Sequence, residues 1–206
     1  MWLSLLVAVA AAYLLGNLNG AVLASLNLKD DVRSHGSGNA GLTNFIRSYG
    51  AARSLSVILV DAGKAFLACL LGRFLLDEYG LGLEGAAIAG LAVMLGHDFP
   101  ALLGFRGGKG IMSGLFIALA VDWRVGLLIL AVFALAYFLT WYVSLGSVLA
   151  AMTFSISFCL LHYDQPVVMI CGAVMGVLTV FMHRQNIVRL LQGQERKTNL
   201  FKKDKQ

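Results

Sequence analysis

The sequence has few of the residues that crosslinks, turns and soluble surfaces require. Of its 206 residues 13% are charged, against about 25% in a typical soluble domain, and 59% are hydrophobic. There are only two prolines, and Cys69, Cys159 and Cys171 lie singly in apolar segments without a CxxC pair. This usage argues against a disulfide framework and a zinc site. Apolar runs such as 124–143 and 166–182 also disfavour a soluble helical protein.

Several catalytic signatures are also missing. The chain contains no GxSxG or HExxH pattern, and no histidine is followed by aspartate five positions later. Residues 36–41 fit G-x-G-x-x-G, but the charged stretch 29–33 precedes them where a dinucleotide site needs a strand. Leu103 and Gly110 occupy positions where a Walker A loop needs glycine and Ser or Thr, so ATP hydrolysis is unsupported.

Long apolar stretches predict an all-α integral membrane protein with seven transmembrane helices. A span needs about 20 apolar residues to cross the hydrocarbon core. We interpret the first stretch as a retained span, because no positive charge precedes it as it would in a signal peptide. The chain, residues 1–206, is then a single domain whose expected spans are 2–26, 54–76, 83–96, 110–121, 124–143, 145–162 and 166–182.

The distribution of basic residues predicts the orientation. The polar stretches 27–53, 97–109 and 183–206 carry 13 of the 16 Lys and Arg, whereas the connections at the opposite side carry two. Basic residues favour the cytoplasmic side. We therefore expect the N-terminus outside, the C-terminus in the cytoplasm and three polar Gly-rich motifs on the cytoplasmic face. The basic tail 198–206 needs no role beyond contact with anionic lipid.

Two features within the spans predict a polar cavity. The apolar run between Lys109 and Asp122 would make about 18 Å of helix, which is too short to cross a membrane. Non-helical backbone at membrane depth occurs only where it lines a cavity or is buried in protein. Asp61 and Lys64 stand three residues apart within a span, which indicates an internal ion pair beside that cavity. Its role, structural or catalytic, stays open.

The first polar motif, residues 29–53, combines glycines with short polar side chains. Gly36, Gly38 and Gly41 free backbone N–H groups to converge, while the polar side chains between them and Arg47 offer further donors to a phosphate. An ordinary flexible loop is the alternative. The candidates in this motif are Gly36, Ser37, Gly38, Asn39, Thr43, Asn44 and Arg47.

The second motif, residues 96–110, places a lysine among glycines where a helix begins. Gly107, Gly108 and Lys109 there are typical of an anion site built from backbone N–H groups and the helix dipole. His97 is ambiguous: it either contacts substrate or holds the loop. A basic turn beside the membrane is the alternative for the whole motif.

The third motif, residues 183–197, follows the last span. His183, Asn186 and Arg189 recur every three residues and would share one face if that helix continued. The alternative is an interfacial histidine with lipid-facing arginines. Taken together, three glycine and cation motifs on one membrane face predict a pocket for a phosphate-bearing substrate.

The three motifs resemble those of the bacterial acyl-phosphate-dependent glycerol-3-phosphate acyltransferases, the PlsY family. That family reads approximately GSGNPGATN…R, GHxFPxFLxFKGGKG and HRxNIxRLxxGxE. The resemblance covers essentially the whole chain, in the same motif order. Ala40 and Leu42 depart from the family's Pro and Ala, and Arg106 from its Lys. The corresponding residues here are Gly36–Asn44 with Arg47, Gly96–Gly110 and His183–Glu195.

The resemblance implies transfer of an acyl group from acyl phosphate to the 1-hydroxyl of glycerol 3-phosphate, giving lysophosphatidic acid and phosphate. It implies no metal, organic cofactor or nucleic acid, and suggests that the leaving phosphoryl group accepts the hydroxyl proton. We expect the two substrates and membrane lipid as partners, a functional monomer, and a location in the bacterial cytoplasmic (inner) membrane; the sequence itself does not give the oligomeric state.

Two alternatives to an acyltransferase remain, and the candidates divide into a catalytic and a substrate-binding set. A phosphate-ester transporter is the main alternative, since a basic cavity beside a short span would suit it too. A structural membrane subunit would leave the motifs unexplained. The expected catalytic residues are Ser37, Arg47, Lys109, His183 and Asn186, and the expected substrate-binding residues are Gly36, Gly38, Asn39, Thr43, Asn44, Gly107, Gly108 and His97.

Overall fold

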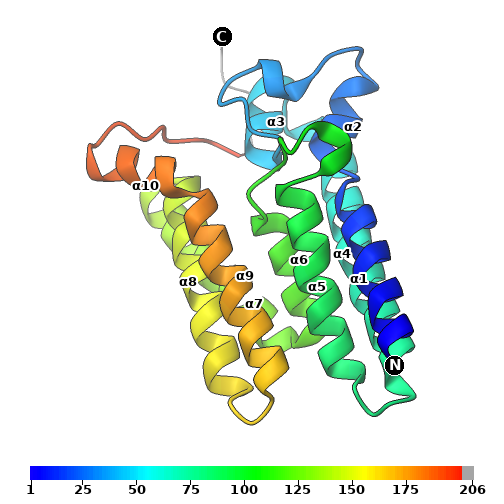
Figure 1. Ribbon diagram of the computed structural model, residues 1–206. Helices are drawn as coiled ribbons and strands as arrows, with labels where there is room; N and C mark the ends of the chain where they lie inside the picture. Colours follow the sequence, from blue (N-terminus) through cyan, green and yellow to red (C-terminus); the bar gives the residue numbers. More distant parts are fainter. Residues whose placement is uncertain (201–206) are drawn as a thin grey trace.

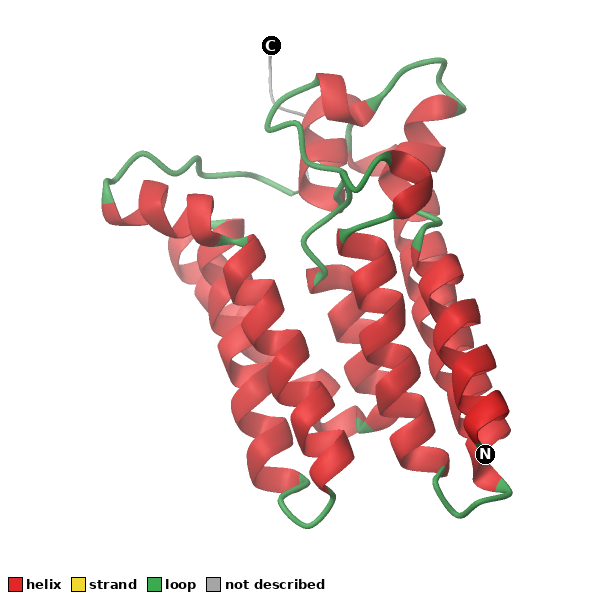
Figure 2. Ribbon diagram, in the orientation of Figure 1, coloured by secondary structure: helices red, strands yellow, loops and turns green. Residues whose placement is uncertain are grey.

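A computed structural model describes residues 1–200, and over that range it consists of helices and loops without a strand (Figures 1 and 2). Residues 201–206, which include most of the basic tail, lie outside the described range. Three short 3-10 turns are η1 (Val32–Ser34), η2 (Ala51–Arg53) and η3 (Ala101–Leu103). The α-helices are α1 (Trp2–Gly16), α2 (Gly20–Leu26), α3 (Leu42–Tyr49), α4 (Leu55–Asp77), α5 (Gly82–Asp98), α6 (Ile111–Val121), α7 (Trp123–Thr140), α8 (Val143–Leu161), α9 (Pro166–Met182) and α10 (Arg184–Leu191).

The long helices have the length and composition of membrane spans. Four apolar segments within residues 1–200 are long enough to cross a bilayer, and they contain α4, α5, α7 and α8. Two bent pairs, α1 with α2 and α9 with α10, pass the same test when each pair is taken together, which makes up to six. Helix α6 is apolar but has 11 residues, so it is as short as the sequence predicts.

Two expected helices are bent where the sequence suggested continuity. The first breaks between α1 and α2 with a 44° change of direction. There the amide of Asn17 donates to Tyr13 O, and Asn19 accepts from the N–H of Val22 and so caps α2. The last span ends at Met182 and turns by 55° into α10, so the third motif lies on a separate helix. Helix α3, inside the first motif, was not predicted.

Small residues let the helices approach closely. A Cβ on Gly72 of α4 would lie 2.2 Å from the carbonyl oxygen of Gly85 in α5, and one on Gly96 of α5 would lie 2.1 Å from the carbonyl oxygen of Tyr13 in α1. Backbones this close are typical of membrane helices, which pack through glycine and alanine. The helices run side by side, while α3, α10 and the loop before α6 gather at one end (Figure 1). The three motifs are therefore brought to the same end of the bundle.

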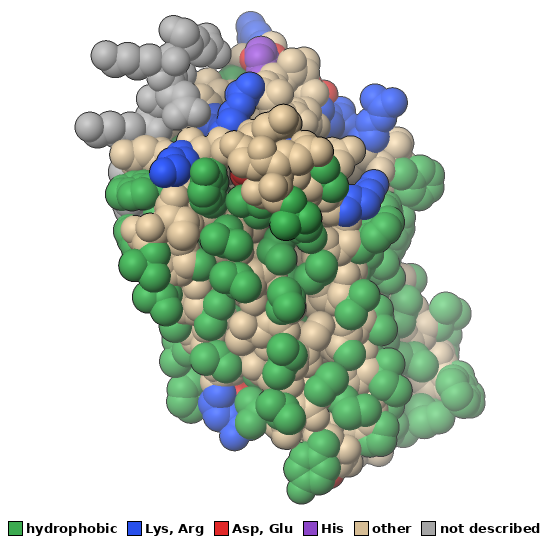
Figure 3. Space-filling view, turned by 90° about the vertical axis from the view of Figure 1, so that its left-hand side faces the viewer, with side chains coloured by type: hydrophobic (Ala, Val, Ile, Leu, Met, Phe, Trp, Pro, Cys, Tyr) green, Lys and Arg blue, Asp and Glu red, His purple; other side chains and the backbone are tan. Residues whose placement is uncertain are grey.

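The outer surface matches a protein embedded in lipid. Hydrophobic side chains cover the long sides of the bundle, and most of the visible Lys and Arg side chains crowd the end that carries the motifs (Figure 3). Large apolar residues such as Phe74, Leu139 and Leu160 are 78%, 73% and 69% exposed. Such surfaces are stable in a bilayer and would aggregate in water.

Candidate active site

A cavity of about 230 Å³ lies at the end of the bundle that carries the motifs. Its polar part is lined by residues from all three motifs, among them Arg47, Lys109 and His183. Its other part runs between α6, α7 and α8 and is lined by Leu115, Ile129, Leu130, Phe133 and Ala150. The cavity therefore joins a cationic end to an apolar arm.

Lys109 links the second motif to the third. It precedes Gly110, whose φ of +76° lets the loop turn into α6. The Lys109 ammonium donates to the side-chain oxygen of Asn186 at 2.5 Å, and the Asn186 amide donates to Glu195 at 2.9 Å. Burial lowers the pKa of Lys109 to about 8, with a further lowering from the positive charge of Arg189. The ammonium is thus poised to take up a compensating anion.

Arg47 reaches the cavity from α3. Its guanidinium donates from Nε to the hydroxyl of Thr198 at 2.9 Å and also from Nη2 to the same oxygen. A planar guanidinium with five N–H donors suits phosphate oxygens, which it binds in pairs. Arg47 and Lys109 both line the cavity and come from separate motifs.

His183 occupies the junction between α9 and α10 and is 4% exposed. Its Nδ1 lies 2.8 Å from the backbone oxygen of Thr179. Since a carbonyl oxygen can only accept, Nδ1 carries the hydrogen in this contact. In the neutral ring Nε2 is then an acceptor, and the side chain lines the cavity.

The first motif is shaped by Asn44 more than by its glycines. The Asn44 amide donates to the carbonyl oxygens of Val32, His35 and Asn39, and its oxygen accepts from the N–H of Ser37. This one side chain holds the loop that presents Ser37 and Asn39 to the cavity, and Thr43 follows in the first turn of α3. Gly36 is needed beside it, because a Cβ there would lie 2.3 Å from the Asn44 side-chain oxygen.

The glycines of the second motif pack against His97. A Cβ on Gly107 would lie 2.0 Å from the His97 carbonyl oxygen, and one on Gly108 would lie 2.0 Å from its Nε2. His97 in turn accepts at Nδ1 from the Lys64 ammonium at 2.7 Å. Lys64 pairs with Asp61 at 2.8 Å, so the expected ion pair is present and lies beneath the loop.

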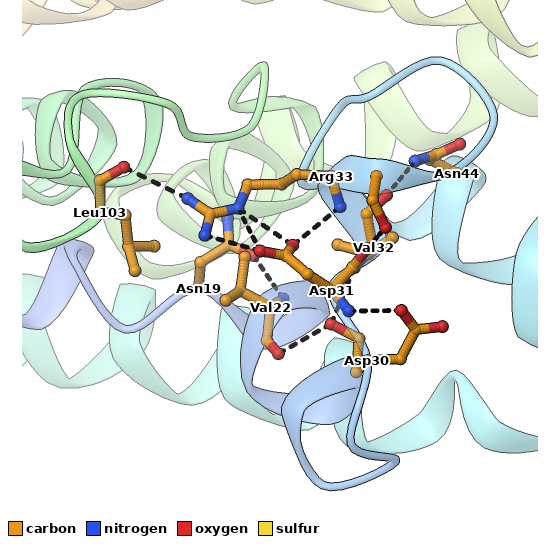
Figure 4. A network of polar contacts seen from close by, with 10 residues as sticks. Asn19, Val22, Asp30, Asp31, Val32, Arg33, Asn44 and Leu103 are labelled. Atoms are coloured by element: carbon orange, nitrogen blue, oxygen red, sulfur yellow. Dashed lines mark hydrogen bonds and ion pairs between the residues drawn. The ribbon is translucent and has the colours of Figure 1, made fainter.

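A surface network ties the first motif to the second (Figure 4). The Arg33 guanidinium donates to the Asp31 carboxylate at 2.8 to 3.1 Å and to the carbonyl oxygen of Leu103 at 3.2 Å. Asp31 also caps η1 through the N–H of Arg33. Because Arg33 bonds both Asp31 in the first motif and Leu103 in the second, it fixes the spacing of the two loops above the cavity.

Most of the candidate residues are brought together. Gly36, Gly38, Gly107 and Gly108 are not among the residues that line the cavity; they shape the loops instead. Sequence reasoning did not assign roles to Arg189 and Glu195, although both belong to the third motif, and it gave no signal for Thr198 or the apolar arm. The candidates that line the cavity are Ser37, Asn39, Thr43, Asn44, Arg47, His97, Lys109, His183 and Asn186.

Fold and cavity together define a multi-span helical membrane protein whose site suits an amphiphile with a phosphate group. The cationic donors at one end have the charge to neutralise a phosphate, and the lining of the apolar arm suits a hydrocarbon chain.

Comparison with known proteins gives the particular family. The sequence model of the family "Glycerol-3-phosphate acyltransferase" matches residues 6–193. A glycerol-3-phosphate acyltransferase of Thermoanaerobacter pseudethanolicus is 40% identical, with 90% of this chain and 91% of the relative covered. One of Clostridioides difficile is 37% identical, with 94% and 95% covered. The chain therefore belongs to the glycerol-3-phosphate acyltransferase family.

Solved structures agree with this family assignment. The crystal structure of PlsY (YgiH), an integral membrane glycerol 3-phosphate acyltransferase in its glycerol 3-phosphate form, has a TM-score of 0.84 and 32% identity, with 95% of this chain and 96% of that chain covered. Its lysophosphatidic acid form has a TM-score of 0.79 and 33% identity, with 96% of each chain covered. The resemblance to the PlsY family seen in the motifs is confirmed.

Proposed function

We propose that this glycerol-3-phosphate acyltransferase takes its acyl group from acyl phosphate and transfers it to the 1-hydroxyl of glycerol 3-phosphate. The observation that carries the proposal is the cavity itself, which joins the cations Arg47 and Lys109 to an apolar arm between α6, α7 and α8. An acyl phosphate has this polarity, with a phosphate at one end and a hydrocarbon chain at the other. The same cationic end suits the phosphate of glycerol 3-phosphate.

The chemistry needs charge neutralisation and orientation more than a strong base. The glycerol 1-hydroxyl oxygen attacks the acyl carbonyl carbon, the carbon–oxygen bond to phosphate breaks, and the departing phosphate takes the hydroxyl proton. Lys109 and Arg47 would stabilise the charge that develops on the phosphate and carbonyl oxygens. Ser37, Asn186 and the acceptor Nε2 of His183 would orient the reacting groups. The transfer is redox-neutral, and the proposal includes neither a metal nor an organic cofactor.

The proposal includes a membrane arrangement. We infer seven spans with the N-terminus outside, the C-terminus in the cytoplasm and the cavity open to the cytoplasm of a bacterial inner membrane. The charge bias supports this orientation, since 13 of 16 basic residues fall in the motif segments and tail. A single cysteine at position 109 should react with a water-soluble thiol reagent from the cytoplasmic side. A site sealed from such reagents would contradict the open cavity.

The family assignment removes the support for a phosphate-ester transporter, because the relatives named above are acyltransferases. The proposal includes a functional monomer embedded in lipid.

The decisive experiment compares two acyl donors. Purified protein in detergent or lipidic phase is given glycerol 3-phosphate with either palmitoyl phosphate or palmitoyl-CoA, and lysophosphatidic acid is measured. We expect product from palmitoyl phosphate alone, and Arg47→Ala should lower its rate about 100-fold. Equal or exclusive use of palmitoyl-CoA would refute the proposed donor.

A further inference from the structure

The segment after α10, residues 194–200, crosses from the end of α10 toward α3 (Figure 1). We call this segment the strap. It begins where the match to the acyltransferase family ends, at residue 193. Glu195 and Leu200 of the strap line the cavity. The strap thus forms part of the wall of the site.

Backbone hydrogen bonds hold the strap against α7. The N–H of Thr198 donates to the carbonyl oxygen of Trp141 at 3.0 Å. The Tyr137 hydroxyl donates to the carbonyl oxygen of Thr198 and accepts from the N–H of Leu200, both at 3.1 Å. Tyr137 is 2% exposed, so this hub is fixed within the packed bundle. The position of Thr198 is therefore set independently of its own side chain.

The Thr198 side chain contacts Arg47, a catalytic candidate from the first motif. Its hydroxyl accepts two hydrogen bonds from Arg47, which lies 151 residues earlier, and Thr198 is 2% exposed. A long arginine side chain has many rotamers, and ordering it when substrate arrives would weaken binding. Two donors on one fixed oxygen restrict both the rotamer and the plane of the guanidinium.

We propose that Thr198 is a positioning residue that orients the Arg47 guanidinium toward a substrate phosphate. This inference rests on the proposed function, in which Arg47 binds phosphate. The strap then contributes to substrate binding. In the opposite arrangement Thr198 would occupy the place of the phosphate and inhibit the enzyme. Removal of its hydroxyl would then lower the KM for glycerol 3-phosphate.

The test removes the hydroxyl and keeps the shape. Thr198→Val retains the side-chain volume and the backbone bonds to Tyr137 and Trp141, whereas Thr198→Ser restores the hydroxyl. In the full chain, Thr198→Val should raise the KM for glycerol 3-phosphate about tenfold, as expected for a lost hydrogen bond to a charged group. Thr198→Ser should stay within about twofold of the wild type. Thr153→Val on α8, at a half-buried threonine whose hydroxyl donates to Leu149 O of its own helix, is the matched control.

A double-mutant cycle shows whether Thr198 acts through Arg47. Thr198→Val added to Arg47→Ala should leave the KM of the single Arg47→Ala variant unchanged. The same variants are also measured by calorimetric binding of glycerol 3-phosphate. Wild-type protein that binds glycerol 3-phosphate but makes no product would refute the proposed function, while the binding constants still test Thr198. Unchanged or tighter binding in Thr198→Val, a serine variant as weak as the valine one, or full additivity with Arg47→Ala would overturn the positioning role.

Discussion

Two lysines of this protein, one buried and one half-buried, have opposite environments. Lys64, within α4, is 3% exposed, and its ammonium lies 2.8 Å from the Asp61 carboxylate. It also donates to the carbonyl oxygen of Leu18 at 2.8 Å and to His97 Nδ1 at 2.7 Å. A lysine has three N–H donors, and this one has an acceptor for each.

Lys109 has one hydrogen-bond acceptor among residues 1–200, the uncharged side-chain oxygen of Asn186. Its electrostatic neighbours include the cations Arg189, Arg47 and Arg184, against the single carboxylate of Glu195. A partly buried charge with more cationic than anionic neighbours is unfavourable, so this arrangement favours the binding of an anion. We infer that a lysine with an acceptor for each of its donors holds the fold, whereas one with few acceptors and cationic neighbours is suited to bind an anionic substrate.

The largest expected effect is on stability at Lys64. Lys64→Met should lower the free energy of unfolding by about 3–5 kcal/mol, because it leaves the Asp61 carboxylate buried and unpaired. Thermal unfolding in detergent, followed by tryptophan fluorescence, measures the change.

The control for Lys64 removes both charges. Asp61→Asn with Lys64→Met should recover most of the lost stability, since two neutral side chains of similar volume replace a buried ion pair. A double variant no more stable than Lys64→Met would mean that the pair contributes more than mutual neutralisation, and the simple contrast between the lysines would fail.

The next effect is on catalysis at Lys109. Lys109→Ala should lower kcat/KM for glycerol 3-phosphate about 100-fold or more by removing a charge that the reaction requires, with a melting temperature close to that of the wild type. Lys109→Arg keeps the charge but changes its geometry and should retain part of the activity. Near-normal turnover in a folded Lys109→Ala protein would remove this residue from the site.

A smaller, pH-dependent effect follows from the same residue. Burial and the neighbouring arginines lower the pKa of Lys109 to about 8, so the protonated form that binds phosphate is lost as pH rises through that value. We expect kcat/KM to fall about 15-fold between pH 8 and pH 9.5. The substrate phosphate does not confound this, because its second pKa is near 6. Lys109→Arg should flatten the profile, and a fall that persists in that variant would assign the pKa elsewhere.

Composition and motif chemistry predicted the membrane class, the short α6 and nine residues that line the cavity. They succeeded because apolar length and clustered glycine and cation motifs act locally. The bend at Asn17–Asn19 was not predictable, because it involves side chains that bond across loops, such as Asn17 to the N–H of Leu102. The bend at His183 was not predicted either. The spacing of apolar residues along the sequence does not reveal such contacts.

The glycines show a second limit of sequence reasoning. Gly107 and Gly108 suggested a phosphate cradle, yet the structure packs them against His97, whose position is set by Lys64 on a different helix. The contact of Thr198 with Arg47 spans 151 residues and belongs to no motif. Tertiary packing decides such roles, and a single sequence does not encode them in a local pattern.

The smallest expected effect is at Arg33, a partly exposed residue that extends the comparison with Lys64 to the surface. The Arg33 guanidinium has acceptors in Asp31 and Leu103, as Lys64 has in its own network, but its side chain is 26% exposed. Water can replace lost partners there, so Arg33→Ala should cost less than about 1 kcal/mol in stability. The KM for glycerol 3-phosphate should rise two- to threefold at most, through the loosened contact to Leu103, roughly the effect of a weakened surface hydrogen bond. Thermal unfolding and steady-state kinetics measure both. A loss above tenfold in kcat/KM would mean that this surface contact, and not the buried Lys64 network, sets the position of the Lys109 loop.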